Sequence, residues 1–179
     1  MYPFIRQIKE FYVHRNAPNL PFDGVHVSHH RCWPQDIDIF IEMNNGRILT
    51  ILDLSRTVLA KRTGLLHGLK ENRWGLTMAG VSVRYRRRIR PFEKFRVVSK
   101  AIGWDERFFY LNQSIWIDET CAAQALYRSA VTGPKGIIPT HDVCRTMNIE
   151  QGSPALPDWV QNWIDAEQTR PWPPQRLDT

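Results

Sequence analysis

The longest amphipathic segment, residues 46–63, constrains the fold more than any other part of the chain. Its apolar residues recur with the spacing of a helix face and not with the alternation of a strand; they are Ile48, Leu49, Ile51, Leu52, Leu54, Val58 and Leu59. The segment opens near Asn45 and Gly46, and asparagine is a strong N-cap because its side-chain oxygen accepts from the free amides of the first turn. At about 1.5 Å rise per residue, the predicted helix is roughly 25 Å long, enough to cross a small sheet.

Alternating segments that predict strands lie on both sides of this helix. They cover about residues 24–32, 74–90, 93–104, 108–117 and 121–132. In the second of them, Val81, Val83, Tyr85 and Ile89 define a half-buried face, and arginines define an exposed one. One strand, a long helix and then antiparallel strands predict an α+β fold, with an antiparallel β-sheet wrapped around the central helix.

The 179 residues fit a single domain with an extension at each end. We expect a helical segment and loop over residues 1–23, the α+β domain over 24–150, and a helix with a proline-rich tail over 151–179. Beyond Arg170 the tail is expected to be extended or disordered.

The first segment carries an apolar stripe at helical spacing, formed by Phe4, Ile5, Ile8, Phe11 and Tyr12. We expect this stripe to dock on the body of the protein or on a partner subunit. Membrane contact is the weaker interpretation, because the stripe is short and carries little positive charge.

Composition is that of an ordinary globular protein, with 42% hydrophobic and 23% charged residues. No apolar run approaches the length of a membrane span, and the first residues lack the regions of a secretory signal. We therefore expect a cytoplasmic protein without a membrane span. Cys32, Cys121 and Cys144 are odd in number and share no close spacing, which predicts free thiols.

A cluster of potential metal ligands occurs in the first strand, at His26, His29, His30 and Cys32. Zinc would need a second pair of ligands at matching spacing, and His141 and Cys144 lie far along the chain. We therefore expect no metal site, and we interpret these histidines as residues of a strand surface.

Three acids, Asp36, Asp38 and Glu42, lie just before the predicted helix start. Amides at a helix start can stabilise the oxygen of a polarised carbonyl, and a nearby carboxylate can attack it or activate water. This combination suits acyl transfer. The alternative is an ordinary turn and helix cap, with the acids solvated in a loop.

The same stretch resembles a known family. The motif Trp33, Asp36, Asp38, Phe40, Asn44 and Asn45 is similar to the signature of hotdog-fold acyl-CoA thioesterases of the 4-hydroxybenzoyl-CoA thioesterase-like group. Further segments resemble its thioesterase superfamily member-like branch, namely Asp53 and Arg56, 64–66, 103–105, 109–111, 156–157 and 163–164. The resemblance covers roughly residues 25–168. It implies a hotdog domain at 24–150, an acyl-CoA substrate, no cofactor apart from the coenzyme A of that substrate, and a homodimer or homotetramer.

The resemblance also implies roles for particular residues. Asp38 matches the acid that relatives use as nucleophile or base, and Glu42 stands where they usually have histidine, preceded by Ile41 in place of glycine. We therefore predict Asp38 as the catalytic residue and Glu42 as a competing one; if both face one cleft, their repulsion would raise one of the two pKa values. The predicted substrate-binding residues are Asn44, Asn45, Gly46 and Arg47.

One further acid remains an alternative. Some hotdog thioesterases carry their carboxylate on the central helix, so Asp53 is a second possible catalytic residue. Asp53 and Arg56 are three residues apart and could pair on the helix surface, for a few tenths of a kcal/mol.

Hydrolysis of an acyl-CoA thioester is the predicted function. Because Glu42 replaces the usual histidine, the alternative function is that of a catalytically silent hotdog protein that binds acyl-CoA or an acyl carrier. A scaffold is the third interpretation, in which the basic stretch Arg84–Arg90 docks an acidic partner or nucleic acid. This stretch carries much of the net charge of +6 and could otherwise attract coenzyme A phosphates or be a solvated face. Nucleic acid is the least favoured partner, since no nucleic-acid-binding motif accompanies the arginines.

Overall fold

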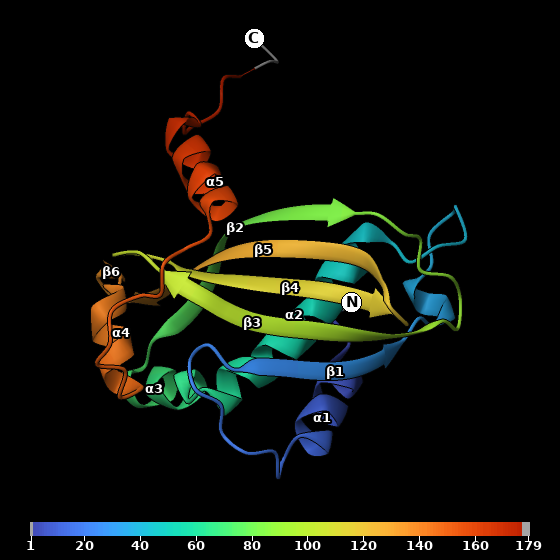
Figure 1. The fold of residues 1–179 in the computed structure, drawn as a ribbon, viewed down its shortest axis with the longest axis horizontal. Helices are drawn as coiled ribbons and strands as arrows, with labels where there is room; N and C mark the ends of the chain where they lie inside the picture. Colours follow the sequence, from blue (N-terminus) through green and yellow to red (C-terminus); the bar gives the residue numbers. More distant parts are fainter. Residues whose placement is uncertain (1, 177–179) are drawn as a thin grey trace.

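The computed structural model describes residues 2–176, and it consists of a curled antiparallel sheet that wraps around one long helix (Figure 1). The strands are β1 (Val25–Arg31), β2 (Gly75–Tyr85), β3 (Lys94–Trp104), β4 (Phe109–Ile117), β5 (Thr120–Gly133) and β6 (Gly136–Ile137). The helices are α1 (Phe4–Val13), η1 (Pro34–Asp36, a 3-10 turn), α2 (Asn45–Arg62), α3 (Leu65–Asn72), α4 (Thr140–Thr146) and α5 (Asp158–Thr169).

The sheet has the strand order β1-β3-β4-β5-β2, with β6 added to β5, and every pairing is antiparallel. β1 and β2 are therefore the two long edge strands. The predicted α+β architecture is confirmed, including the hairpins that follow β3 and β4.

The central helix α2 begins as predicted. The Asn44 side-chain oxygen accepts hydrogen bonds from the amides of Gly46 at 2.9 Å and Arg47 at 3.3 Å, so Asn44 is the N-cap. Ile51, Leu52 and Leu54 are fully buried in the largest apolar cluster, which α2 shares with β3, β4 and β5. The helix is held by this burial and by its cap.

Replacing Asn44 by alanine is expected to lower the free energy of unfolding by about 1 kcal/mol, since the first-turn amides lose their acceptor. Urea unfolding measures the change. Asn45→Ala is the matched control, because Asn45 lies one residue inside the helix and its side chain caps nothing in the structure. Equal stability of the Asn44→Ala and Asn45→Ala proteins would contradict this assignment.

Strand β2 differs from its prediction. It ends at Tyr85, and Ile89 lies beyond it in a loop, where its side chain is buried and its carbonyl accepts the Met43 amide at 2.9 Å. The expected half-buried face is present only in part, because Val83 packs against the core cluster whereas Val81 and Tyr85 are 41% and 42% exposed. The reason is position in the sheet: β2 is an edge strand that pairs only with β5.

Helix α1 packs in the opposite sense to its prediction. Gln7 and Glu10 are its buried residues, whereas four of the five residues of the apolar stripe point to solvent, namely Phe4, Ile5, Ile8 and Tyr12. Docking of this stripe on the body of the protein is therefore wrong, and docking on a partner subunit stays a prediction. The polar side faces inward because the adjacent strand β1 presents polar side chains there, as described below.

The C-terminal helix α5 is confirmed. Val160 and Ile164 are buried against Tyr110 and Leu126 of the sheet, and Trp159 is exposed. Residues 171–176 have no regular secondary structure, and the expectation for residues 177–179 lies outside the described residues. None of the helices within residues 2–176 is long and apolar enough to cross a membrane.

Candidate active site

The loop between η1 and α2 folds back on itself at Asp38. The Asp38 amide donates to the Glu42 carbonyl at 2.9 Å, and the Ile41 amide donates to the Asp38 carbonyl at 3.1 Å. The Asp38 carboxylate accepts the Phe40 amide through Oδ1 at 2.8 Å. Its Oδ2 has no hydrogen-bond partner among residues 2–176, so this oxygen is available to water or to a bound molecule.

Ile41 lies at the tip of this loop with a φ of 59°. For a β-branched residue this left-handed conformation costs roughly 1–2 kcal/mol, whereas glycine adopts it freely. The backbone at position 41 therefore has a conformation that suits glycine, the usual residue here in the family that the motif resembles, although this chain carries isoleucine.

Glu42, the second predicted catalytic acid, is engaged elsewhere. Its Oε2 lies 2.9 Å from Nε of Arg88, in the loop after β2. A guanidinium at this distance offsets the carboxylate charge, so it opposes the mutual repulsion expected between Asp38 and Glu42. Glu42 is held as an ion pair in the position where a histidine is usual.

Asp36, the first acid of the motif, has a structural task. Its buried carboxylate lies 2.7 Å from Nη2 of Arg6 in α1 and 3.3 Å from Nε of Arg47 in α2. It also accepts the Trp33 amide at 2.9 Å. Asp36 therefore ties α1, η1 and α2 together beside the loop that carries Asp38.

The start of α2 offers one amide to a ligand. Those of Gly46 and Arg47 already donate to Asn44, whereas the Asn45 amide has no acceptor among the described residues. Asn44, Asn45 and Gly46 are all exposed. The four predicted substrate-binding residues thus lie together, but Asn44 acts as the cap and only Asn45 presents an unengaged amide.

An apolar pocket of about 240 Å³ lies between α2 and the sheet, towards β2. Its wall is built from elements far apart in the sequence and includes Leu59, Leu66, Leu76, Met78, Phe109 and Leu111. Asp53 and Arg56 supply charge to this wall. Sequence reasoning missed the pocket, because its lining reaches from Phe22 to Met147 without a shared local pattern.

The pairing of Asp53 with Arg56 is confirmed, at 2.7 Å between Oδ1 and Nη2. The pair is not a simple surface pair, because the Arg56 side chain is only 12% exposed and lies 4.4 Å from the Tyr127 ring centroid. The Tyr2 hydroxyl donates to Asp53 Oδ2 at 2.9 Å. Burial, followed by this hydrogen bond, raises the pKa of Tyr2, so it remains a donor and both oxygens of Asp53 are engaged.

Asp53 and the start of α2 are too far apart to belong to one catalytic site. Eight residues separate Asp53 from Asn45, which corresponds to about 12 Å along α2. One carbonyl carbon cannot contact both, so within one chain the two candidate carboxylates define alternative sites.

Strand β1 corrects the interpretation of His26 and His30 as surface residues, whereas His29 is exposed as expected. His26, Ser28 and His30 are buried, whereas Val25 and Val27 on the other face are exposed. Ser28 bonds His30 Nε2 at 2.9 Å and donates to Ser55 of α2 at 3.0 Å. The strand is polar inside because its neighbours supply hydrogen-bond partners, and no signal in β1 alone could have revealed them.

The polar row continues into the interior. Ser55 shares a hydrogen bond of 2.9 Å with Ser99 of β3, and Gln113 of β4 donates to Ser99 at 2.7 Å. At the other end, His30 Nδ1 lies 3.9 Å from Oε1 of the buried Glu10 in α1. This continuous row therefore connects α1, β1, α2, β3 and β4.

Stability is expected to fall as the pH drops from about 6.5 to about 4. Burial, and then the charges of His14 and Arg62, lowers the pKa of His26 to about 4, and burial lowers that of His30 to about 3. The unfolded chain binds these protons first, near pH 6.5, so this contribution is complete above that pH and is lost as the pH falls towards the folded pKa. Urea midpoints against pH measure it.

Two histidine variants provide the control for this pH dependence. His26→Asn removes one of the shifted groups and should flatten the fall in the urea midpoint. His67→Asn on α3, where the side chain is 74% exposed, should leave the fall as it is in the wild type. An unchanged fall in the His26→Asn protein would contradict the assignment to His26.

Neither the histidines nor the cysteines form a metal cluster within residues 2–176, where no group of three potential ligands lies close enough to hold an ion. Cys32, Cys121 and Cys144 are free thiols. Burial raises the pKa of Cys32 and of Cys144 to about 11, so neither is a ready nucleophile at neutral pH.

The basic stretch Arg84–Arg90 is mostly a loop. Arg84 is in β2, and the remaining arginines follow the end of the strand at Tyr85; all are exposed. Arg87 pairs with Glu93 at 2.7 Å and Arg88 with Glu42. Part of the positive charge is therefore balanced by Glu93, just before β3, and by Glu42, in the loop before α2.

A curled antiparallel sheet that wraps around one long helix is the hotdog fold (Figure 1). Residues 32–164 match the family model of the Thioesterase-like superfamily. The chain belongs to this superfamily, which confirms the resemblance stated from the motif between Trp33 and Asn45.

Individual proteins support the assignment. Protein THEM6 of Drosophila melanogaster is 33% identical over 138 residues, which are 75% of this chain and 69% of that protein. Protein THEM6 of Xenopus laevis is 31% identical over 133 residues, 73% of this chain and 63% of that protein. The chain thus spans about two thirds of these relatives. The 1,4-dihydroxy-2-naphthoyl-CoA thioesterase Slr0204 from Synechocystis has the same fold, with a TM-score of 0.60 and 11% identity over 71% of this chain and 97% of that one.

Proposed function

We propose that this protein hydrolyses the thioester bond of an acyl-CoA. The observation that carries the proposal is the apolar pocket of about 240 Å³ beneath α2, in a member of a superfamily of thioesterases. A pocket with this lining suits the far end of an acyl chain and not the polar coenzyme; with the thioester carbonyl at the start of α2, about 12 Å from Asp53 along the helix, the acyl chain extends from there into the pocket. The structural neighbour from Synechocystis, a CoA thioesterase by name, is consistent with the proposal.

Asp38 is our proposed catalytic residue. It attacks the thioester carbonyl to give an acyl-aspartyl anhydride that water then hydrolyses, or it takes the proton from a water that attacks directly. In both cases the Asn45 amide donates to the carbonyl oxygen as it becomes negative. Collapse of the tetrahedral intermediate then breaks the C–S bond and releases the coenzyme A thiolate, which takes up a proton from solvent. Asp38 is favoured over Asp53 because it keeps an oxygen without a partner, whereas Arg56 and Tyr2 engage both oxygens of Asp53. Coenzyme A takes part only as a portion of the substrate, and its phosphates fit the exposed arginines of the Arg84–Arg90 stretch.

The test is the release of free thiol from a panel of acyl-CoAs with short, long and aromatic acyl groups. Turnover on part of the panel is the expected result, and the preferred acyl group reports the length and shape of the pocket. No turnover on any member, with the protein folded, would overturn the proposal.

A second candidate function rests on Glu42. Because Arg88 holds this carboxylate where histidine is usual, a protein that binds acyl-CoA or an acyl carrier without cleaving it is the alternative. Tight binding of a non-hydrolysable acyl-CoA analogue, combined with no thiol release, would favour it.

The assembly is proposed to be a homodimer, or a tetramer built from such dimers, formed through β2. This strand has eleven residues, and one of its two edges pairs with no described strand; such edges pair readily with another chain. Val81→Lys places a charge on this exposed strand and is expected to shift the mass measured by analytical ultracentrifugation towards the monomer. An unchanged mass would contradict pairing through β2.

The cytoplasmic location stays a prediction from the sequence.

A further inference from the structure

The outer face of α1 is apolar and uncovered. Its side chains are strongly exposed, at 66% for Phe4, 85% for Ile5, 68% for Ile8 and 63% for Tyr12. The buried face of α1 carries Gln7 and Glu10. Side chains that flank this face hold the helix in place through polar contacts, which include Arg6 with Asp36 at 2.7 Å and Lys9 Nζ with the His29 carbonyl at 3.4 Å. The helix is therefore anchored with its apolar side directed away from the protein.

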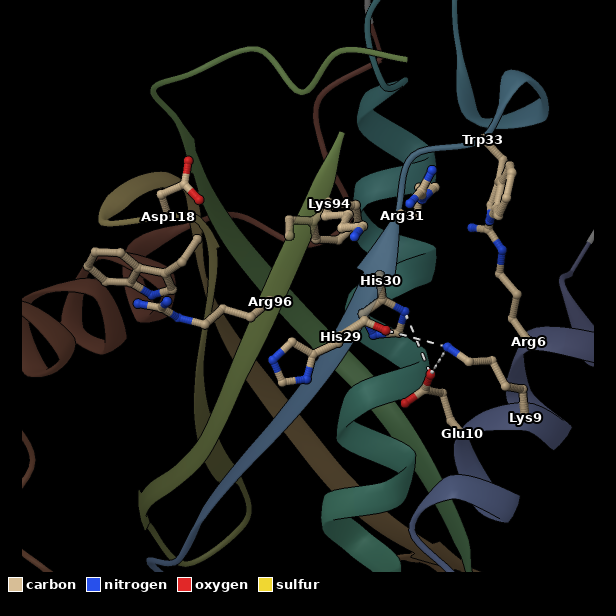
Figure 2. Close-up of a pocket in the computed structure, with 12 residues that line it drawn as sticks. Arg6, Lys9, Glu10, His29, His30, Arg31, Trp33, Lys94, Arg96 and Asp118 are labelled. Atoms are coloured by element: carbon tan, nitrogen blue, oxygen red, sulfur yellow. Dashed lines mark hydrogen bonds and ion pairs between the residues drawn. The ribbon is translucent and has the colours of Figure 1, made fainter. Parts of the chain in front are cut away.

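A basic pocket of about 470 Å³ adjoins this helix, and Figure 2 shows it between α1 and strands β1 and β3. The cations on its wall are Arg6, Lys9, Arg31, Lys94 and Arg96. Among the described residues, Arg31 and Lys94 form no ion pair. The rim includes Trp33 and Trp116, which lie under the guanidinium groups of Arg31 and Arg96.

Acids balance three of the five cations of this pocket, namely Arg6, Lys9 and Arg96, and leave Arg31 and Lys94 without an ion pair among residues 2–176. The Glu10 side chain is only 2% exposed and is turned towards Lys9 and His30, as Figure 2 shows. Asp118 lies at the far rim, beyond Arg96, in the same view. The accessible part of the pocket thus presents mainly cationic and aromatic groups, which suits a phosphate group with an apolar environment beside it.

The geometry points to a docking surface for a membrane that contains anionic phospholipids, formed by the outer face of α1 and the basic pocket beside it. The apolar side chains of α1 enter the boundary between headgroups and acyl chains, and a lipid phosphate binds Arg31 and Lys94. Neither the pocket beneath α2 nor Asp38 takes part, so this inference does not rest on the proposed hydrolase activity.

A second copy of the chain fits this surface less well. α1 lies beside β1, and β2 is at the opposite edge of the sheet (Figure 1), so a copy paired through β2 leaves α1 uncovered. A symmetric contact through α1 itself would bring the cationic pockets of two copies near each other, which is unfavourable. A bilayer with anionic headgroups supplies both the apolar layer and the opposite charge.

The experiment is co-sedimentation of the full chain with vesicles of phosphatidylcholine alone and of phosphatidylcholine mixed with phosphatidylserine. We expect binding to the mixed vesicles that weakens as salt is added. Ile5→Asp should lower the partition coefficient at least about tenfold, because a side chain that would be buried in the bilayer becomes charged. Lys94→Glu should lower it about fivefold or more.

Matched controls place the same changes elsewhere. Trp172→Asp alters an 89% exposed aromatic in the C-terminal segment, and Lys135→Glu reverses an exposed charge in the β5–β6 turn; both should bind as the wild type does. All these positions are exposed, so far-UV circular dichroism should be unchanged throughout. Absence of vesicle binding, or equal binding by the Ile5→Asp protein, overturns the inference. A lower mass of Ile5→Asp in ultracentrifugation without lipid also overturns it, because α1 would then be a contact between copies.

Discussion

Asp38→Asn is expected to lower kcat for thioester hydrolysis by about 10²- to 10⁴-fold, the range for loss of a positioned catalytic base. Asparagine retains the side-chain oxygen that accepts the Phe40 amide, so the loop between Asp38 and Glu42 keeps its shape. The variant therefore removes the charge and basicity and leaves the local fold intact. Thiol release under saturating acyl-CoA measures kcat, and thermal unfolding verifies that the protein is folded.

Asp53→Asn distinguishes the two candidate carboxylates. It breaks the pairing with Arg56 on the wall of the pocket, so we expect altered KM and stability with a far smaller loss of kcat. The reverse pattern, full activity in a folded Asp38→Asn protein and none in the Asp53→Asn protein, would move the catalytic carboxylate to α2.

Asn45→Pro is expected to lower kcat about 10²- to 10³-fold, as for other sites that lose one donor to a developing oxyanion. Proline has no amide hydrogen, and it is well tolerated at the first position of a helix, which Asn45 occupies. The preceding Asn44 has a ψ of 138°, an extended conformation that a following proline favours. The substitution thus deletes one donor from α2 with little other change.

Asn45→Ala is the control for this experiment, since it removes the side chain and keeps the amide. Activity should follow the amide: near wild type with alanine and strongly reduced with proline, at similar melting temperatures. If both variants retain wild-type kcat, the Asn45 amide does not contact the reacting carbonyl. If both lose it equally, the side chain and not the amide carries the effect.

The elements that could be predicted from the sequence are those governed by local signals. Asn44 and the apolar stripe of α2 mark that helix, because capping and helical periodicity act within a few residues. Strands β3 and β4 follow their alternation, since other strands flank them on both edges and one face meets α2, whereas β5 is buried over most of both faces. The motif between Trp33 and Asn45 likewise identified the fold and the superfamily.

The features that could not be predicted depend on neighbours distant in the sequence. Residues Val25–Arg31 alternate correctly for a strand, but which face is buried was decided by Ser55 and Ser99. The exposure of β2 follows from its place at the sheet edge, and the pocket requires Phe22 and Met147 to meet beneath α2. In the acid-rich loop, nothing in the sequence separates Asp36, which binds two arginines, from Asp38, which does not.

The polar row on β1 has a consequence for how this strand finds its pairing register with β3. A shift by one residue would turn Val25 and Val27 inward and would move His26 and Ser28 to the solvent. Burial of apolar surface alone would favour that misaligned arrangement. The native alignment is selected instead by directional hydrogen bonds, one from Ser28 to Ser55 and one between Ser55 and Ser99. Two small hydroxyl groups in the interior thereby specify the alignment of an entire edge strand.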